Sequence, residues 1–572
     1  MQCKYLVEVM EPQTHIVKVK IEASRADNDS LVFFLPSWSP GSYLMREYSR
    51  NIRTLKALSA NGEYLNYEQT SKNEWLIDFK NSDLKSDCTN FSVEYEVFCH
   101  ELTVRTSHVD ESHAFLHGPS YLMGVKDKDI APVIEFKFSG LWSKLHTGLT
   151  DISTKREQFI YSAENYDVLI DAPVEIGCHD SDGFMVAGKE HHLIWYGEEY
   201  PHNNNLKADI KKIVETVSEH FSSIPYEQYT FMTHLKKDLY GGLEHLNSTA
   251  LQFDGRKFAV RADYVNWLAL VAHEYFHTWN VKRIRPIELG PFDYQSENYT
   301  KMHWLTEGLT SFMDELFVVR SGLCSIEEYL GMQAKNLAAY FSIPGKKFHS
   351  LEASSFNAWI KLYRPDENSK NSSISYYLKG GLVFSTLHFE FKKVGKNIND
   401  LLTALWDRYL LNPSVGVTTN EVLAMIETIG SKGIRDQFEL RINTTEDIDF
   451  ESYYKENGME LEWSDESTQI DLGCEFSYEG DRAIISKVTL DGSAYTSGLN
   501  AGDEIIAINN VRVLKVDIEQ LPNFLLPDKN YNLTISRLGK LIRFEMIFSR
   551  GSRKLKGIKV IDSAKVKETF LS

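Results

Sequence analysis

The sequence predicts a multidomain α+β protein, because the character of its 572 residues changes twice along the chain. Up to about residue 185, short segments alternate apolar and polar residues between turn signals. From about 186 to 445, a mixed region leads into segments with helical periodicity, and alternating segments then return. A chain of this length also exceeds what one hydrophobic core supports, so several domains are expected.

Residues 1–185 are expected to form a β-sandwich-like domain. Residues 15–22 (HIVKVKIE), 91–98 (FSVEYEVF) and 133–138 (VIEFKF) have the period of two that is typical of half-buried strands. Three pairs of turn residues punctuate this part: Pro40-Gly41, Asn61-Gly62 and Asp182-Gly183. Short strands separated by such turns favour an all-β domain.

Residues 186–445 are expected to hold a mixed α/β region followed by helices. A strand is predicted at 228–233, between helices at 206–221 and 264–280. Further helices are predicted at 306–319, 326–340, 378–391, 398–409, 419–430 and 433–442. An acidic stretch at 444–460 is expected to be irregular. Strands and a short helix within 516–524 are predicted for 460–552, and 553–572 is expected to be a C-terminal tail.

Composition excludes some classes of partner and favours a reducing compartment. The formal charge of −18 argues against general nucleic-acid binding, and the basic stretch at 550–559 is interpreted as part of a solvated tail. No apolar run reaches the roughly 18–20 residues of a membrane helix, and the start of the chain lacks a signal-peptide core. The six cysteines show no C-x-x-C spacing. A cytoplasmic protein is therefore expected, with no indication of its oligomeric state.

The motif His273-Glu274-Tyr275-Phe276-His277 predicts a metal site. Residues four apart on a helix leave the same face, which is the spacing that one tetrahedral Zn²⁺ requires of two imidazoles. Glu274 follows the first ligand, where its carboxylate can act as general base on a metal-bound water. Chance would produce this pattern roughly 0.04 times in such a chain. The alternative is a pair of hydrogen-bonded structural histidines on a buried helix.

A zinc hydrolase needs a third protein ligand, and Glu307 is the best candidate. It opens the next predicted helix after a loop rich in proline and glycine, whereas the competing Glu297 lies in a polar, irregular stretch. Asp314, two helical turns beyond Glu307, could hydrogen-bond the free nitrogen of a ligating histidine. A solvated surface carboxylate is the alternative for Asp314.

The strings HEYFHTWNVKRIRP (273–286) and WLTEGLTSF (304–312) resemble the glycyl aminopeptidase family, gluzincin metallopeptidases with a thermolysin-like catalytic core. LPSWSPGSY (35–43) is similar to that family's N-terminal β-domain signature. The resemblance implies a β-sandwich-like domain at 1–185, a thermolysin-like zinc domain at 186–445 and a PDZ-like domain at 460–552. It also implies one Zn²⁺ per chain, peptide substrates and a preference for small N-terminal residues, Gly or Ala.

Two further motifs carry over from this resemblance. In Tyr240-Gly241-Gly242-Leu243-Glu244-His245, the resemblance implies that Glu244 binds the α-ammonium group of the substrate, while Gly241 and Gly242 let a strand edge approach the peptide. This motif departs from the Gly-Ala-Met-Glu-Asn form of the larger zinc aminopeptidases. An ordinary Glu at the end of a strand is the alternative.

The second motif is Tyr376-Tyr377-Leu378-Lys379-Gly380-Gly381, which resembles the Tyr-x-Lys-Gly segment of zinc aminopeptidases. Tyr377 aligns with the tyrosine that stabilises the tetrahedral intermediate in that family. A phenol donor aimed at a developing oxyanion contributes a few kcal/mol in a dry site. The adjacent Tyr376 leaves the choice between the two open, and both could instead be packing residues.

The segment 497–509 (SGLNAGDEIIAIN) resembles the helix-to-strand segment of bacterial PDZ modules. Leu472 and Gly473 then stand where a carboxylate-binding loop would present backbone N–H groups to a peptide or protein C-terminus. A module that only packs against the catalytic part is the alternative.

Three functions follow for the chain. The first is a zinc aminopeptidase that releases Gly or Ala from peptides, with His273, His277 and Glu307 holding the metal. The second is a zinc endopeptidase or oligopeptidase in which Glu244 is structural. The third is a non-catalytic, PDZ-type peptide-binding protein with a structural metal, against which the intact base Glu274 argues. Cobalt or manganese could replace zinc, although His₂Glu ligation favours zinc.

Overall fold

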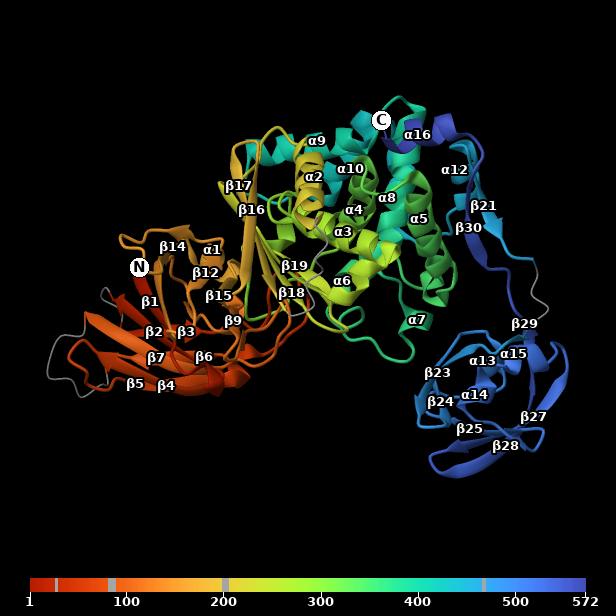
Figure 1. Ribbon diagram of the computed structural model, residues 1–572, viewed down its shortest axis with the longest axis horizontal. Coiled ribbons are helices and arrows are strands. Elements are labelled where there is room, and N and C mark those ends of the chain that lie inside the picture. The colour runs from red at the N-terminus through yellow and green to blue at the C-terminus, as the bar shows by residue number, and fades with distance from the viewer. Residues whose placement is uncertain (26–28, 81–88, 198–204, 466–469, 572) are drawn as a thin grey trace. The chain divides into compact units, whose positions relative to one another are not determined.

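The computed structural model describes residues 1–572 apart from 26–28, 81–88, 198–204, 466–469 and 572 (Figure 1). Residues 198–204 of the predicted catalytic domain and 466–469 of the predicted PDZ-like domain therefore lie outside the described residues. The described chain divides into two compact units. The first comprises Met1–Tyr299, Arg320–Leu323 and Leu402–Thr418, and the second comprises Thr300–Val319, Cys324–Leu401 and Thr419–Ser572.

The largest sheet of the first unit has the strand order β13-β14-β11-β1-β2-β7-β4, shown in red and orange in Figure 1. The strands predicted at 15–22, 91–98 and 133–138 are confirmed as β2, β7 and β11. β1 pairs antiparallel with β2 but parallel with β11. The strands are β1 (Gln2–Val9), β2 (Ile16–Ser24), β4 (Ile52–Ser59), β7 (Asn90–Phe98), β11 (Ala131–Phe138), β13 (Thr150–Asp151) and β14 (Ile160–Ser162).

Two four-stranded sheets complete the N-terminal β-rich part, in the orders β10-β3-β6-β5 and β12-β15-β9-β8. Buried residues from all three sheets, among them Tyr5, Trp75 and Ile176, form one hydrophobic cluster, as expected of sheets whose alternate residues face a common core. The strands are β3 (Ser30–Phe34), β5 (Asn66–Ser71), β6 (Glu74–Asp78), β8 (His108–Val109), β9 (His113–Leu116), β10 (Gly124–Val125), β12 (Lys144–Thr147) and β15 (Val174–Gly177). Helix α1 (Tyr166–Asp171) precedes β15.

A mixed five-stranded sheet follows, in the order β16-β17-β18-β20-β19. Its three inner strands run parallel, and β19 pairs antiparallel with β20 at one edge. The strands are β16 (Asp180–Val186), β17 (Lys189–Tyr196), β18 (Gln228–Leu235), β19 (Tyr240–Glu244) and β20 (Ser248–Phe253), and the helices of this part are α2 (Leu206–Ser218) and α3 (Arg261–Phe276). The strand predicted at 228–233 is thus confirmed.

The turn predicted at Asp182-Gly183 is wrong, because both residues lie inside β16. A Cβ on Gly183 would come within 2.9 Å of the carbonyl oxygen of His191 on the neighbouring strand. The glycine therefore permits close strand pairing rather than a turn. The turn itself lies at Ala187-Gly188, where both residues have positive φ.

The next helices along the chain lie in the second unit. They are α4 (Leu309–Arg320), α5 (Ile326–Phe341), α6 (Leu351–Phe356), α7 (Ser369–Ser372), α8 (Tyr376–Lys393), α10 (Thr419–Ile429), α11 (Lys432–Asn443) and α12 (Phe450–Glu456), while α9 (Ile398–Leu411) crosses the division between the units. All six helices predicted between 306 and 442 are present. The stretch 444–460 is not wholly irregular, because Asp449 caps α12 and Phe450 and Tyr454 anchor it in the interior.

A small β-rich body follows, drawn in blue in Figure 1, with the sheet order β23-β24-β25-β27-β28. Its own hydrophobic cluster includes Ile485, Leu533 and Ile535. The elements are β22 (Ile470–Asp471), β23 (Cys474–Glu479), β24 (Arg482–Val488), α13 (Ser493–Thr496), β25 (Glu504–Ile508), β26 (Val511–Arg512), α14 (Lys515–Ile518), α15 (Leu521–Phe524), β27 (Asn530–Arg537), β28 (Lys540–Ile547) and β29 (Ser549–Arg550). The single helix predicted within 516–524 is two short ones.

The segment 553–572, expected as a tail, contains β30 (Leu555–Val560) and α16 (Ser563–Leu571). β30 pairs with β21 (Met459–Trp463), and Val566 and Phe570 of α16 are fully buried. Lys556 and Lys559 of β30 are exposed although the strand itself is paired. The prediction of a solvated tail at 553–572 is therefore wrong.

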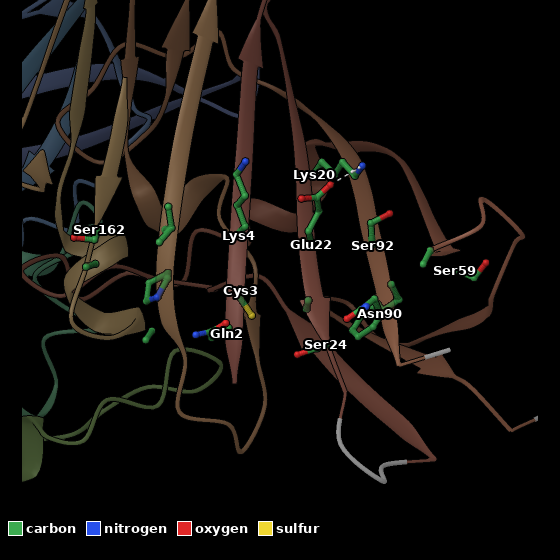
Figure 2. Close-up of a pocket in the computed structure, with 17 residues that line it drawn as sticks. Gln2, Cys3, Lys4, Lys20, Glu22, Ser24, Ser59, Asn90, Ser92 and Ser162 are labelled. Carbon is green, nitrogen blue, oxygen red and sulfur yellow. Dashed lines mark ion pairs between the residues drawn. The ribbon is translucent and has the colours of Figure 1, made fainter. Parts of the chain in front are cut away.

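A hollow of the first unit lies near the start of β1 (Figure 2). Figure 2 shows Lys4, Lys20, Glu22 and Ser92 along adjacent strands there, with an ion pair of 2.9 Å between Lys20 and Glu22. No residue predicted for the functional site lines this hollow. Among the described helices, none is both long and apolar enough to cross a membrane.

Candidate metallopeptidase site

Helix α3 carries the two candidate histidine ligands at its C-terminal end. It is buried around most of its circumference, with Trp267, Leu268 and Val271 fully enclosed. The helix ends at Phe276, and His277 is its C-cap residue in a helical conformation. The two imidazole rings therefore still leave one face, with ring centroids 4.6 Å apart.

The backbone after α3 fixes the orientation of His277. Its Nδ1 lies 2.7 Å from the carbonyl oxygen of Asn280, and the ring is 1% exposed. Because a carbonyl can only accept, Nδ1 carries the hydrogen and Nε2 keeps its lone pair. This is the arrangement that metal-ligating histidines use.

Strand β19 brings Gly242 against Glu274. A Cβ on Gly242 would overlap the carboxylate of Glu274, so only glycine allows the strand to pass this close. Gly241 has a φ of +154°, and β19 lies at the edge of its sheet. Arg105 donates to the carbonyl of Gly242 at 3.3 Å. The predicted base and the strand edge are thus neighbours, which is what addition of a substrate strand requires.

Glu244 ends β19 and is 4% exposed. One oxygen each of Glu244 and Glu274 and one nitrogen of His277 lie within 4.8 Å of one another. A Cβ on Gly41, which has a φ of +83°, would lie 2.5 Å from Oε1 of Glu244. The loop around Gly41 therefore packs directly against this carboxylate. Two carboxylates this close and this buried favour the binding of cationic groups between or beside them.

The turn after Glu244 is held by a buried ion pair. Asp171 lies 2.6 Å from Nζ of Lys282 and accepts from the backbone N–H of Leu246 at 2.7 Å. Its other neighbour is Nδ1 of His245 at 3.4 Å. Burial alone would raise the pKa of Asp171, but Lys282 and His245 outweigh it and lower the pKa to about 2. The carboxylate is therefore ionised at neutral pH and holds the end of β19 in place.

In the second unit, Glu307 lies in a π-helical turn, Trp304–Gly308, that leads into α4. Its side chain is 2% exposed. A Cβ on Gly308 would lie 2.8 Å from Cα of Gly380 on α8, so these two glycines set the turn directly against that helix. π-helical turns often occur at functional sites because they change the direction of a side chain.

Tyr376 and Tyr377 begin α8 and differ in accessibility. Tyr376 is fully buried and packs against His303 with ring centroids 5.0 Å apart, whereas Tyr377 is only partly buried. Desolvation, and then the charge of Glu307, raise the pKa of Tyr377 well above its usual value. The phenol therefore keeps its proton at neutral pH and can donate it in a hydrogen bond.

Asp314 lines a small pocket of the second unit together with Tyr377, Glu315 and Asn336. Burial, and then the charge of Asp314, raise the pKa of Glu315 to about 8. Asp314 belongs to none of the groups of potential metal ligands formed by the described residues, and neither does Glu297, which lies in an irregular segment.

In the small β-rich body, the predicted carboxylate-binding loop at Leu472 and Gly473 already makes a hydrogen bond within the chain. Gly473 has a φ of +68°, and its N–H donates to the carboxylate of Asp471 at 2.9 Å. The neighbouring strand β23 lies at the edge of its sheet. An incoming terminal carboxylate would meet the like charge of Asp471, so strand addition to β23 is the easier contact for a peptide.

Sequence reasoning did not identify Gly41, Arg105, Asp171 or the carbonyl of Asn280 as parts of this region. Gly41 was predicted only as a turn residue and as part of a family signature, and Arg105 and Asp171 belong to the β-rich part. Their contacts with 242–246 join segments far apart in the chain. Only the turn residues Pro40-Gly41 offered a local signal.

A His-Glu-x-x-His helix beside the edge strand of a mixed sheet defines a metallopeptidase. Sequence models identify which kind: that of the M61 glycyl aminopeptidase matches residues 266–383, and that of the peptidase M61 N-terminal domain matches residues 4–178. Together these matches cover just over half of the chain, which therefore belongs to the M61 glycyl aminopeptidase family. A PDZ domain model matches residues 462–535. No curated protein sequence matches the chain.

Solved structures similar to this one include an aminopeptidase N family protein and an M1 zinc metallopeptidase. An aminopeptidase N family protein from Idiomarina loihiensis is 26% identical, covers 99% of this chain and 100% of its own, and gives a TM-score of 0.91. An M1 zinc metallopeptidase from Deinococcus radiodurans is 12% identical, covers 78% of this chain and 94% of its own, and gives a TM-score of 0.50. The second likeness concerns the fold alone.

Proposed function

We propose that this aminopeptidase uses one catalytic zinc ion to release small N-terminal residues, Gly or Ala, from peptides. The observation that carries the proposal is the buried position of Glu244 beside Glu274 and His277. An exopeptidase must recognise a free α-ammonium group at a fixed distance from the reacting bond. A buried carboxylate next to the general base meets that need. The preference for Gly or Ala rests on the family to which the chain belongs.

His273, His277 and Glu307 would hold the zinc ion. In support, the two imidazole rings leave one face of α3 with their centroids 4.6 Å apart, and the Glu307 side chain is 2% exposed within its own unit. The donor set is that of a catalytic zinc site with an open fourth position. The hydrogen bond from His277 to Asn280 favours the tautomer that ligates through Nε2. When bound, zinc would act as a Lewis acid on the scissile carbonyl and the attacking water.

The residues of the chain would perform the remaining steps. Glu274 takes a proton from the attacking water and passes it to the leaving amine. Tyr377 donates a hydrogen bond to the oxygen that gains negative charge. Glu244 binds the α-ammonium group, and the edge of β19 at Gly241 and Gly242 pairs with the substrate backbone. Asp314 lines a pocket together with Tyr377, and its hydrogen bond to a ligating histidine stays a prediction.

The experiment compares a glycine anilide with its N-acetylated form. Cleavage of the free amine and at least a 100-fold slower cleavage of the acetylated form is expected, because acetylation removes the charge that Glu244 binds. Equal cleavage of both would indicate an endopeptidase or oligopeptidase with a structural Glu244. Cleavage of neither by zinc-loaded protein, on a panel of N-terminal residues, would leave only the non-catalytic peptide-binding alternative.

We also propose a reducing, cytoplasmic location and a peptide-binding role for the PDZ domain. Cys3, Cys99, Cys178 and Cys474 are free cysteines, which is consistent with a reducing compartment. The edge of β23 next to Leu472 and Gly473 is where a peptide or a protein C-terminus would add. Fluorescence anisotropy with peptides that end in a carboxylate or an amide would test this role, and equal binding is expected because Asp471 occupies the N–H of Gly473.

A further inference from the structure

A second group of potential metal ligands lies on the hairpin of β8 and β9, within the first unit. Its residues, His108, Asp110 and His113, have the spacing His-x-Asp-x-x-His. One ring nitrogen of each histidine and one oxygen of Asp110 lie within 4.8 Å of one another. None of the three belongs to the proposed catalytic site.

Both histidines have one nitrogen fixed by an acceptor. Nδ1 of His108 lies 3.1 Å from the carbonyl oxygen of His100, and Nδ1 of His113 lies 2.7 Å from Oε1 of Glu175. A carbonyl and a carboxylate both accept, so each Nδ1 carries the hydrogen and each Nε2 keeps its lone pair. These contacts reproduce the outer hydrogen bonds of ligating histidines, which set the tautomer and the ring orientation.

The nitrogen left available on His113 has no other use among the described residues. The side chain is 1% exposed, and its Nε2 has no hydrogen-bond partner within the described part of the chain. Buried polar atoms are normally satisfied, so such an atom calls for an explanation. A cation accepting the lone pair provides one.

The geometry around Asp110 suits an ion. Oδ1 accepts from the backbone N–H groups of Ser112 at 2.8 Å and His113 at 3.2 Å, which holds the loop. Oδ2 lies 3.1 Å from Nε2 of His108. Two ligands on a tetrahedral ion with bonds of about 2.0–2.1 Å would be separated by roughly 3.3 Å. The Asp110 side chain is 33% exposed, so an ion can enter from solvent.

We propose that His108, Asp110 and His113 bind a divalent cation of the zinc class, separate from the catalytic site. Two imidazoles and one carboxylate, with solvent as the fourth ligand, favour zinc over magnesium or calcium. The site is structural. Glu175, which holds His113, also accepts from Nε2 of His234 on β18 at 2.9 Å. The ion therefore connects the hairpin to the five-stranded sheet through buried hydrogen bonds.

The test counts zinc in the full-length protein after loading and removal of free metal. Asp110→Asn is expected to bind one zinc fewer per chain than the wild type, while Glu111→Gln, an exposed carboxylate of the same loop, binds the same number. The comparison holds whatever the number of ions elsewhere, so it is independent of the proposed catalytic zinc. Elemental analysis by mass spectrometry gives the count.

Retained peptidase turnover would show that Asp110→Asn is folded, and His108→Asn is a second variant should the first fail to fold. Loss of one equivalent in a folded variant, with a thermal midpoint that no longer rises on zinc addition as far as in the wild type, supports the site. Equal zinc content in the wild type and in either folded variant would overturn the proposed cation site. The contact between His108 and Asp110 would then be an ordinary hydrogen bond.

Discussion

At the scale of single residues, Tyr376 and Tyr377 offer a direct comparison. Tyr377→Phe is expected to lower kcat about 100- to 1000-fold, because it removes the proposed donor to the oxyanion. Tyr376→Phe is expected to change kcat less than 10-fold, because its ring is enclosed against His303. Steady-state kinetics on a glycine anilide measures both. A larger loss of kcat for Tyr376→Phe than for Tyr377→Phe would show that Tyr376, rather than Tyr377, is the donor.

The sequence was sufficient for residues whose role depends on local spacing. His273, Glu274 and His277 were predicted from helical periodicity, and the structure places the two histidines on one face of α3. It was insufficient where a contact joins distant segments. The contact of Gly41 with Glu244 and the pairing of Asp171 with Lys282 depend on how the β-rich part packs against 240–246. No local pattern encodes that packing.

At the scale of elements, Gly380 of α8 controls the approach to the turn that carries Glu307. Gly380→Ala is expected to push α8 away from the turn that carries Glu307, since the new Cβ would lie 2.8 Å from Cα of Gly308. Overpacking of this kind costs about 1–3 kcal/mol. Gly381→Ala on the same helix meets its nearest atoms at 3.6 Å, an ordinary contact.

Differential scanning calorimetry and zinc titration would compare the two alanine variants. A lower thermal midpoint and weaker zinc binding are expected for Gly380→Ala and not for Gly381→Ala. If both variants had the thermal midpoint and the zinc affinity of the wild type, the claim that close packing of Gly308 and Gly380 positions Glu307 would be wrong.

The sequence predicted the type of each helix or strand better than it predicted where that element begins and ends. The helix predicted at 264–280 ends at Phe276, and the chain beyond it turns so that the carbonyl of Asn280 accepts a hydrogen bond from His277. The pair Asp182-Gly183 looked like a turn, but its glycine serves close strand pairing. The strand β30 was missed because its partner β21 is remote in sequence.

At the scale of the whole molecule, acid stability includes a contribution from Asp171. Its pKa is lowered from 3.8 to about 2, so it adds stability above the unfolded pKa, and this is lost as the pH falls through the folded pKa. Asp171→Asn is expected to cost about 2 kcal/mol at pH 7. The difference from the wild type should hold down to about pH 4 and then shrink.

Thermal midpoints measured from pH 7 to pH 3 would reveal this dependence on Asp171. The exposed Asp129 provides the matched control, Asp129→Asn, with no such pH-dependent difference expected. A difference between Asp171→Asn and wild type that grows as the pH falls would contradict the sign argued for this ion pair.

The order of the large parts was predictable, whereas their internal pairing was not. Alternating and helical periods indicated a β-rich beginning, a mixed and helical middle and a β-rich end, and the matches to the family and PDZ models confirm that order. The parallel pairing of β1 with β11 and the buried contacts of Glu175 with two histidines involve long sequence separations. Periodicity carries no information about such partners.

The most direct test of the catalytic assignment is zinc content and turnover of Glu274→Gln. Glu274 is proposed to move protons without binding the metal, so this variant should keep the zinc content of the wild type and lose at least 1000-fold in kcat. Glu219→Gln, an exposed carboxylate after α2, should retain both. Turnover within 10-fold of wild type in a zinc-loaded Glu274→Gln protein would contradict the account.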